Sequence, residues 1–126
     1  MSKYRVLIVD DEPLIRSLLE KYFKADGKFE YDVQSDGSFI MDEHFSLNYD
    51  LVVFDILMPK VNGIELLQNI KKRNSTVKVM GITGMANDGL IRQLHDLGCK
   101  NIIKKPVKRK EFMDKVYAEL NIPITT

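Results

Sequence analysis

The sequence predicts an α/β protein in which a parallel β-sheet is covered by helices. Short runs of β-branched and other apolar residues alternate with segments whose apolar residues recur every three or four positions. This is the pattern of βα units joined by right-handed crossovers, and the chain contains five of them. At 126 residues, with 44% hydrophobic and 29% charged residues, it suits one globular domain over residues 1–126.

Local patterns place the individual elements. Apolar runs predict strands at residues 6–9, 31–35, 51–54, 77–82 and 102–103. Helical spacing predicts five helices, at residues 14–23, 38–45, 66–73, 90–97 and 112–120, of which the second has only an irregular apolar face. Gly27, Gly98 and Asn121 are typical of helix ends, and Pro59 with Asn62-Gly63 marks a turn.

Charged or hydroxyl side chains stand at the ends of four of the predicted strands. Asp10 and Asp11 follow the first strand and Asp55 the third, while Thr83 and Lys105 follow the fourth and fifth. The carboxyl ends of parallel strands share one edge of a sheet, where open α/β sheets bind ligands. We therefore expect these side chains to converge in space.

The acidic residues need a positive partner. Asp55 interrupts an apolar stretch, and two carboxylates about 4 Å apart repel by about 4 kcal/mol at an effective dielectric constant of about 20. The Lys105 ammonium and a divalent cation are the candidates, and an all-oxygen site suits Mg²⁺ better than zinc. A structural alternative is that Asp11 or Glu12 caps the first helix, with Pro13 in its first turn.

These residue types suit phosphoryl transfer. An aspartate flanked by Mg²⁺, a lysine and a hydroxyl can act as a nucleophile toward phosphorus and form an aspartyl phosphate. Negative charge spreads over three equatorial oxygens in such a reaction, so Mg²⁺, the Lys105 ammonium and the Thr83 hydroxyl would each take one.

Short motifs surround each of these residues, in a characteristic order and spacing. They are Val9-Asp10-Asp11-Glu12, Asp55 with Met58-Pro59 and Gly63-Ile64-Glu65-Leu66, Ile82-Thr83-Gly84, Gly98-Cys99 and Lys105-Pro106. Over essentially its whole length, the chain resembles the receiver domain of two-component response regulators. The resemblance implies a flavodoxin-like, doubly wound sheet of five parallel strands in the order 2-1-3-4-5, with five helices.

The resemblance also implies roles for the site residues. Asp55 would be the phosphoacceptor and a Mg²⁺ ligand, and Asp11 a direct ligand. Asp10 would act on the metal mostly through water, and Leu57 would contribute its backbone carbonyl. Lys105 would pair with the phosphoryl group, held by a cis bond to the following proline.

The implied partners follow from the same resemblance. The phosphodonor would be a sensor histidine kinase or a histidine phosphotransfer protein. Phosphorylation would switch the binding of an output partner or output domain, with or without dimerisation. The domain would not be a turnover enzyme.

Some positions depart from the family pattern. Ile102 stands where an aromatic side chain commonly turns inward on phosphorylation, which puts that switch in question here. Leu57 and Met85, two residues after Asp55 and Thr83, are apolar where the family is often polar. Because apolar cover hinders an attacking water, we predict a long-lived phosphoaspartate. Residues 36–48 lack the small-residue helix pattern typical of the family.

Other functions fit less well. A haloacid-dehalogenase-type phosphatase needs a second acid two residues beyond its nucleophile, where this chain has Leu57. A flavin-binding module needs Ser, Thr or Gly in the loop after the first strand, where this chain has Asp10-Asp11-Glu12. A vestigial receiver that acts as a phosphorylation-independent scaffold stays open.

Composition bears on partners and location. The net charge is +1. The basic run over residues 104–110 lacks interleaved aromatic residues, so a solvated helix start explains it best, and docking of a protein is a stronger alternative than binding of nucleic acid. The single cysteine, Cys99, is expected to be a buried apolar side chain and fits a reducing cytoplasm. No signal-peptide pattern or apolar stretch of ~20 residues is present, so we expect no export and no membrane insertion.

Overall fold

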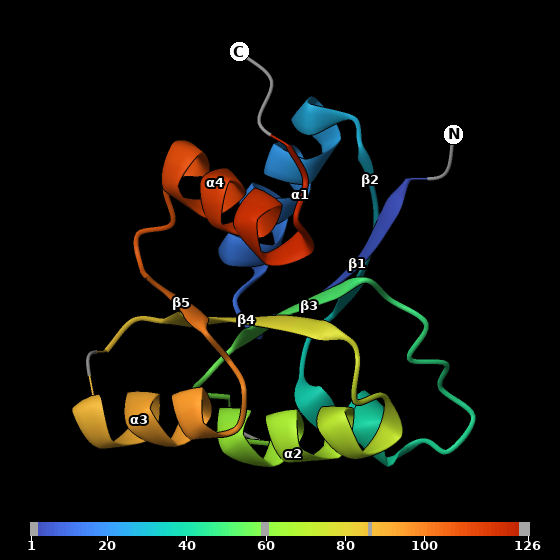
Figure 1. The fold of residues 1–126 in the computed structure, drawn as a ribbon, viewed down its shortest axis with the longest axis vertical. Coiled ribbons are helices and arrows are strands. Elements are labelled where there is room, and N and C mark those ends of the chain that lie inside the picture. The colour runs from blue at the N-terminus through green and yellow to red at the C-terminus, as the bar shows by residue number, and fades with distance from the viewer. Residues whose placement is uncertain (1–2, 59–60, 86, 124–126) are drawn as a thin grey trace.

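The computed structural model describes residues 3–58, 61–85 and 87–123, which form a five-stranded parallel sheet with helices on both faces (Figure 1). The strand order is β2-β1-β3-β4-β5. The strands are β1 Tyr4–Val9, β2 Phe29–Gln34, β3 Leu51–Asp55, β4 Lys78–Thr83 and β5 Asn101–Lys104. This confirms the predicted α/β class and the order 2-1-3-4-5.

The helices form two layers around the sheet. Helices α1 (Pro13–Asp26) and α4 (Arg109–Leu120) cover one face, and α2 (Gly63–Arg73) and α3 (Asp88–Asp96) cover the other (Figure 1). Alternate residues of β1 enter two separate cores: Val6 and Ile8 pack in the cluster that contains Phe23 and Phe112, whereas Leu7 packs in the opposite one. Because both faces are buried, the central strands are continuously apolar.

The predicted helix ends are confirmed by backbone conformation. Gly27 has φ 84° and its N–H donates to the carbonyl of Phe23, 3.2 Å away, which closes α1. Gly98 follows α3 with φ 97°, and Asn121 closes α4 with φ 56°. Glycine and asparagine are the residues that adopt this left-handed conformation most readily.

The prediction of a second α-helix at residues 38–45 is wrong. In the described residues the structure has four α-helices and, after β2, a short 3-10 helix, η1 (Gly37–Met41). Residues 36–48 are rich in Gly, Ser, Asp and Asn, which have low helix propensity, and their apolar side chains do not form one helical face. The Asp36 side chain accepts the N–H of Ser38 and starts the 3-10 turn instead.

Side chains from the end of α2 hold the irregular chain that follows η1. The Arg73 guanidinium donates to the carbonyls of Ile40 and Phe45, and the Asn74 amide donates to the carbonyl of Leu47 at 3.0 Å. The ring centroids of Phe39 and Phe45 lie 4.9 Å apart in the same segment. Carbonyls that a regular helix would satisfy internally are therefore satisfied by α2.

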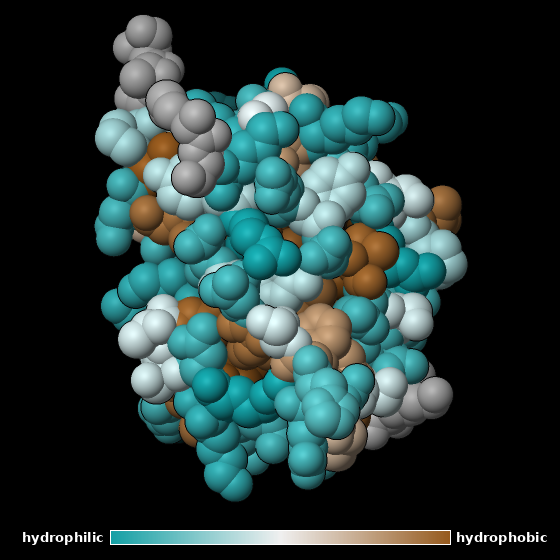
Figure 2. Space-filling view, turned by 90° about the vertical axis from the view of Figure 1, so that its right-hand side faces the viewer, coloured by the Kyte–Doolittle hydropathy of each residue, from teal (hydrophilic) through white to brown (hydrophobic). Residues whose placement is uncertain are grey.

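The molecule presents no large apolar face in Figure 2, which views the side where the chain before β3 lies. That surface is mainly hydrophilic, with separate small apolar patches. Among the described residues, no helix combines the length and the apolar character that a membrane span requires. Pro59, part of the predicted turn before α2, lies outside the described residues.

We expect Gly63→Ala to destabilise the protein by about 1–3 kcal/mol, because the new Cβ would lie 2.8 Å from the carbonyl oxygen of Ile56 and 2.9 Å from its Cα. The Gly63 N–H also donates to that carbonyl at 2.7 Å, so the backbone has little freedom to retreat. Urea unfolding would measure the loss. Gly89→Ala in α3 is the control, since its nearest neighbour would be 3.5 Å away and alanine favours helix. Equal midpoints for the two variants would contradict this account.

Candidate functional site

The residues predicted at the strand ends converge at the carboxyl edge of the sheet. Asp10 and Asp11 follow β1, Asp55 and Thr83 end β3 and β4, and Lys105 follows β5. Among the described polar and charged residues, Asp10, Asp55 and Thr83 are the buried ones, each at most 4% exposed. Since β1, β3 and β4 are adjacent in the sheet, residues far apart in sequence meet here.

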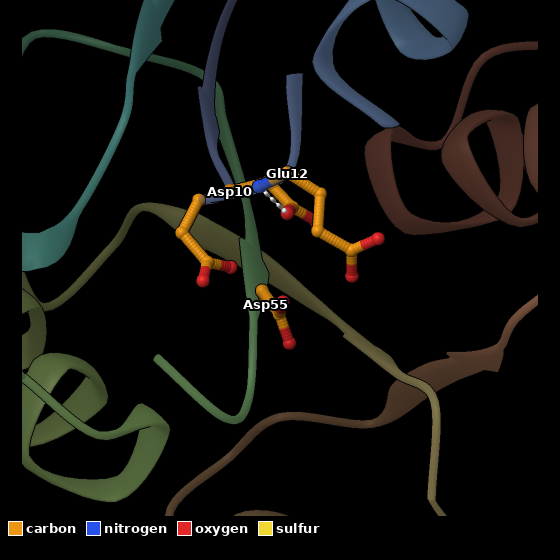
Figure 3. A group of neighbouring side chains, drawn as sticks. Asp10, Glu12 and Asp55 are labelled. Carbon is orange, nitrogen blue, oxygen red and sulfur yellow. Dashed lines mark hydrogen bonds between the residues drawn. The ribbon is translucent and has the colours of Figure 1, made fainter. Parts of the chain in front are cut away.

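Four carboxylates crowd this edge. Oxygens of Asp10, Asp11, Glu12 and Asp55 lie within 4.8 Å of one another. Figure 3 shows the side chains of Asp10, Glu12 and Asp55 projecting toward one space from the loop after β1 and the end of β3. At that separation each like-charged pair repels by roughly 3–4 kcal/mol at an effective dielectric constant of about 20, so the cluster favours binding of positive charge.

Lys105 supplies one such charge. Its ammonium lies 3.3 Å from Asp55 Oδ2 and 3.8 Å from Asp10 Oδ2, and its closest ion pair is with Glu12 Oε1. Burial lowers the pKa of Lys105, but the hydrogen bond to Glu12 and the charges of Asp10 and Asp55 outweigh it and raise the pKa above its usual value. The peptide bond from Lys105 to Pro106 is cis, as the resemblance implies.

Asp10 has an unsatisfied oxygen. Its Oδ1 accepts the N–H of Glu12 at 2.8 Å, whereas its Oδ2 is buried without a hydrogen-bond partner. Burial is the main cause that raises the pKa of Asp10 to about 6, and the charge of Asp55 adds to it. A buried carboxylate oxygen without a hydrogen-bond partner, beside three other carboxylates, fits a hard divalent cation that takes oxygen ligands.

The pKa of Asp55 is also shifted in opposite directions by burial and by neighbouring groups. Burial raises its pKa, while the Leu57 N–H, 3.1 Å from Asp55 Oδ1, and the Lys105 ammonium act in the opposite direction. The two carboxylate oxygens have different partners: Oδ1 accepts the backbone N–H and Oδ2 faces Lys105. The side chain is therefore fixed in orientation at the end of β3.

Thr83 lies at the site, but its hydroxyl is engaged elsewhere. The hydroxyl donates to the carbonyl of Met85 at 2.7 Å and accepts the N–H of Met85 at 3.1 Å. This arrangement ties Thr83 to the loop that follows β4. The structure thus brings Thr83 to the predicted place without a hydrogen bond to Asp55.

Glu12 and Arg16 contribute in ways that the sequence did not predict. Glu12 is the residue before α1, yet its side chain makes no capping hydrogen bond and pairs with Lys105, 93 residues away. The Arg16 guanidinium donates to the carbonyl of Asp10 at 2.7 Å and holds the turn between β1 and α1. The adjacency of Glu12 to two aspartates was the available signal, but its partner depends on the fold.

The departures from the family pattern have structural counterparts. Leu57 and Met85 are 48% and 68% exposed, each two residues beyond a site residue. Ile102 is half-buried and pairs in register with Gly81 of β4. A Cβ on Gly81 would lie 3.1 Å from Ile56 and 3.5 Å from Ile102, so the absence of a side chain there leaves room for both isoleucines.

Comparison with known proteins identifies the family to which the chain belongs. A family model described as the response regulator receiver domain matches residues 6–117. The chain belongs to this family. As a receiver domain of two-component signalling it is a phosphoacceptor, and its acidic pocket with Lys105 is consistent with the phosphorylation site. Membership implies a histidine kinase as partner.

Individual relatives agree with this assignment. The chain is 31% identical over 121 residues to the chemotaxis protein CheY of Treponema pallidum, covering 94% of this chain and 84% of that protein. It is 34% identical over 104 residues to the Regulator of RpoS of Escherichia coli K12, of which it spans 31%. It also spans about half, 49%, of the transcriptional regulatory protein ResD of Bacillus subtilis, to which it is 30% identical.

Solved structures show the same fold. A CheY-like receiver domain protein from Methanospirillum hungatei has a TM-score of 0.84 at 27% identity, covering 95% of both chains. A CheX–CheY–BeF₃–Mg²⁺ complex from Borrelia burgdorferi has a TM-score of 0.83 at 30% identity, covering 93% of this chain and 89% of that one. The acidic cluster described above is typical of the Mg²⁺ site of receiver domains.

We expect Asp10→Asn to stabilise the metal-free protein at about pH 7.5, on the order of 2 kcal/mol, because asparagine keeps the acceptor for the Glu12 N–H and removes a buried charge. The pKa of Asp10 is about 6 in the folded chain against 3.8 for an ordinary aspartate, so the folded chain binds the proton more tightly and stability falls as the pH rises through this window. The difference in the free energy of unfolding between the variant and the wild type should therefore shrink toward pH ~5.

Urea unfolding in the presence of a chelator would measure this difference, and Mg²⁺ should raise the stability of the wild type more than that of the variant. Glu43→Gln, in the exposed chain before β3, is the control for loss of a carboxylate outside the site. A variant less stable than the wild type at both pH values would contradict the account.

Proposed function

We propose that Asp55 accepts a phosphoryl group, in a Mg²⁺-dependent reaction, from a phosphohistidine on a sensor histidine kinase or histidine phosphotransfer protein. One observation carries the proposal: Asp55 is buried at the end of β3, with its carboxylate 3.3 Å from the Lys105 ammonium and clustered with three other carboxylates. A carboxylate buried beside a fixed cation is positioned as a nucleophile toward phosphorus.

The transfer exchanges one bond for another. A carboxylate oxygen of Asp55 forms a bond to phosphorus as the P–N bond to the donor imidazole breaks. The electron pair of the P–N bond goes to the ring nitrogen, which takes up a proton, and the product is an acyl phosphate on Asp55. Lys105 would neutralise charge on a phosphoryl oxygen, since its ammonium already faces Asp55 Oδ2.

The remaining charge calls for a cation. Asp10, Asp11 and Asp55 would hold Mg²⁺ with the backbone carbonyl of Leu57. The absence of a hydrogen-bond partner for the buried Asp10 Oδ2 supports this set. When bound, Mg²⁺ supplies positive charge for the carboxylates and for the phosphoryl oxygens. Asp10 would act mostly through water, consistent with one of its oxygens already accepting a backbone N–H.

Output would follow from a change of partners by Thr83. Its hydroxyl would leave the carbonyl of Met85 and donate to a phosphoryl oxygen, releasing the loop before α3. Such a step needs only to bias a two-state equilibrium that an output partner or output domain reads. The domain would act in the cytoplasm as a switch and not as a turnover enzyme. We expect no direct binding of nucleic acid by this domain.

The first test is intact-mass analysis after incubation with acetyl phosphate. We expect one phosphoryl adduct on the wild type when Mg²⁺ is present and none with a chelator, because the carboxylates need a cation beside the phosphoryl group. Asp55→Asn should form no adduct. Glu43→Gln, outside the site, should be phosphorylated like the wild type.

The same measurement addresses the rival hypothesis. A wild type that forms no adduct at any Mg²⁺ concentration would favour a vestigial receiver that acts as a phosphorylation-independent scaffold. An adduct that persists in Asp55→Asn would place the modification on a different residue.

A second prediction concerns the lifetime of the phosphoaspartate. The double variant Leu57→Asn with Met85→Glu should lose its phosphoryl group about tenfold faster than the wild type. Polar side chains would admit and orient the attacking water at two positions that now carry exposed apolar side chains. A tenfold change in rate corresponds to about 1.4 kcal/mol in the activation barrier. Loss of the adduct over time by intact mass gives the rate. Leu14→Asn is the control, since Leu14 is an apolar side chain 83% exposed at the start of α1. Rapid loss from the wild type, unchanged in the double variant, would contradict the prediction.

A further inference from the structure

Lys105 contacts three carboxylates that differ in their freedom to move. Its ammonium faces Asp55 Oδ2 at 3.3 Å and Asp10 Oδ2 at 3.8 Å, and it contacts Glu12 Oε1 most closely. The side chains of Asp10 and Asp55 are 1% and 5% exposed, whereas that of Glu12 is 54% exposed. The tightest partner of the lysine is thus the one with direct access to water.

The backbone of Glu12 is fixed while its carboxylate is not. The Glu12 N–H donates to Asp10 Oδ1, and the Glu12 carbonyl accepts the N–H of Arg16 at 3.1 Å in the first turn of α1. The side chain makes no capping hydrogen bond to the helix. Rotation of this side chain into solvent would break its contact with Lys105 and would leave the start of α1 in place.

We propose that Glu12 is a displaceable counter-ion, which holds Lys105 while Asp55 is unmodified and yields it when Asp55 carries a phosphoryl group. The inference rests on the proposed function of Asp55. An ammonium has three N–H donors, and a phosphoryl oxygen on Asp55 would need one of them. Its arrival would also add negative charge to a site where four carboxylates already lie within 4.8 Å.

Displacement of Glu12 would leave an N–H donor of Lys105 for the phosphoryl oxygen and would move one negative charge away from the site. The exposed carboxylate regains hydration when it swings out, whereas Asp10 and Asp55 have no such route. The Glu12–Lys105 pair also joins the loop after β1 to the loop after β5, so phosphorylation would release a link between them. In the unmodified protein Glu12 therefore competes with the phosphoryl group for the same ammonium.

Competition predicts that removal of the Glu12 charge strengthens binding of a phosphoryl analogue. Titration of the wild type and of Glu12→Gln with BeF₃⁻ at saturating Mg²⁺, followed by backbone amide NMR signals, should give a dissociation constant about tenfold lower for the variant, equivalent to about 1.4 kcal/mol. Glu65→Gln is the matched control, because it removes the same charge from the first turn of α2. Its dissociation constant should equal that of the wild type.

A double variant tests whether the effect acts through Lys105. Glu12→Gln combined with Lys105→Met should bind BeF₃⁻ no more tightly than Lys105→Met alone, because the ammonium for which Glu12 competes is gone. Tighter binding by the double variant would show that Glu12 acts by direct repulsion of the anion and would overturn the proposal. Mg²⁺ alone should bind Glu12→Gln within about threefold of the wild type; a loss of tenfold or more would make Glu12 a metal ligand and would also overturn it.

The BeF₃⁻ titration separates the proposed function of Asp55 from the role given to Glu12. A wild type that binds no BeF₃⁻ at saturating Mg²⁺ would remove the proposed function of Asp55 and this inference with it. A wild type that binds BeF₃⁻, together with a Glu12→Gln variant that binds equally or more weakly, would leave the function of Asp55 intact and overturn the role given to Glu12.

Discussion

Electrostatic repulsion at the carboxyl edge of the sheet is the constraint on which the rest of the site depends. Four carboxylates lie within 4.8 Å of one another, and in the described residues Lys105 is the cation that contacts three of them. Such a cluster forms only where the surrounding fold is stable enough to hold it together. The two apolar cores that bury β1, β3 and β4 from both faces supply that stability.

The parallel sheet explains why so much of the arrangement was predictable. Strands buried on both faces appear in the sequence as continuous apolar runs, and in a parallel sheet the residue after each run lies at one edge. Asp55, Thr83 and Lys105 were therefore placed by strand pattern alone, with boundaries that differ from the structure by one or two residues. The stops at Gly27 and Gly98 were predictable for a similar reason, since a left-handed residue is a local requirement.

What the sequence did not predict depends on contacts between distant segments. Asp36 starts a 3-10 turn after β2, and the irregular chain that follows is held by Arg73 and Asn74 at the end of α2, contacts that local propensity does not reveal. The position of Glu12 suggested a helix cap, but its carboxylate accepts a hydrogen bond from the distant Lys105 ammonium and none from the adjacent N–H groups of α1. The hydroxyl of Thr83 was placed correctly at the edge, while its bonds to Met85 depend on how the following loop turns.

Two of these unpredicted contacts, those of Glu12 and Thr83, share one property: each occupies a group that the phosphoryl chemistry would use. Glu12 holds the Lys105 ammonium, and the carbonyl of Met85 holds the Thr83 hydroxyl. In the folded chain both of these donors therefore have acceptors before any ligand arrives, whereas the buried Asp10 Oδ2 has no hydrogen-bond partner. A phosphoryl group on Asp55 would compete with these acceptors for both groups, so its binding free energy would be coupled to the loops after β1, β4 and β5. Coupling of this kind is how a chemical change at one carboxylate can reach the surface of a rigid α/β fold.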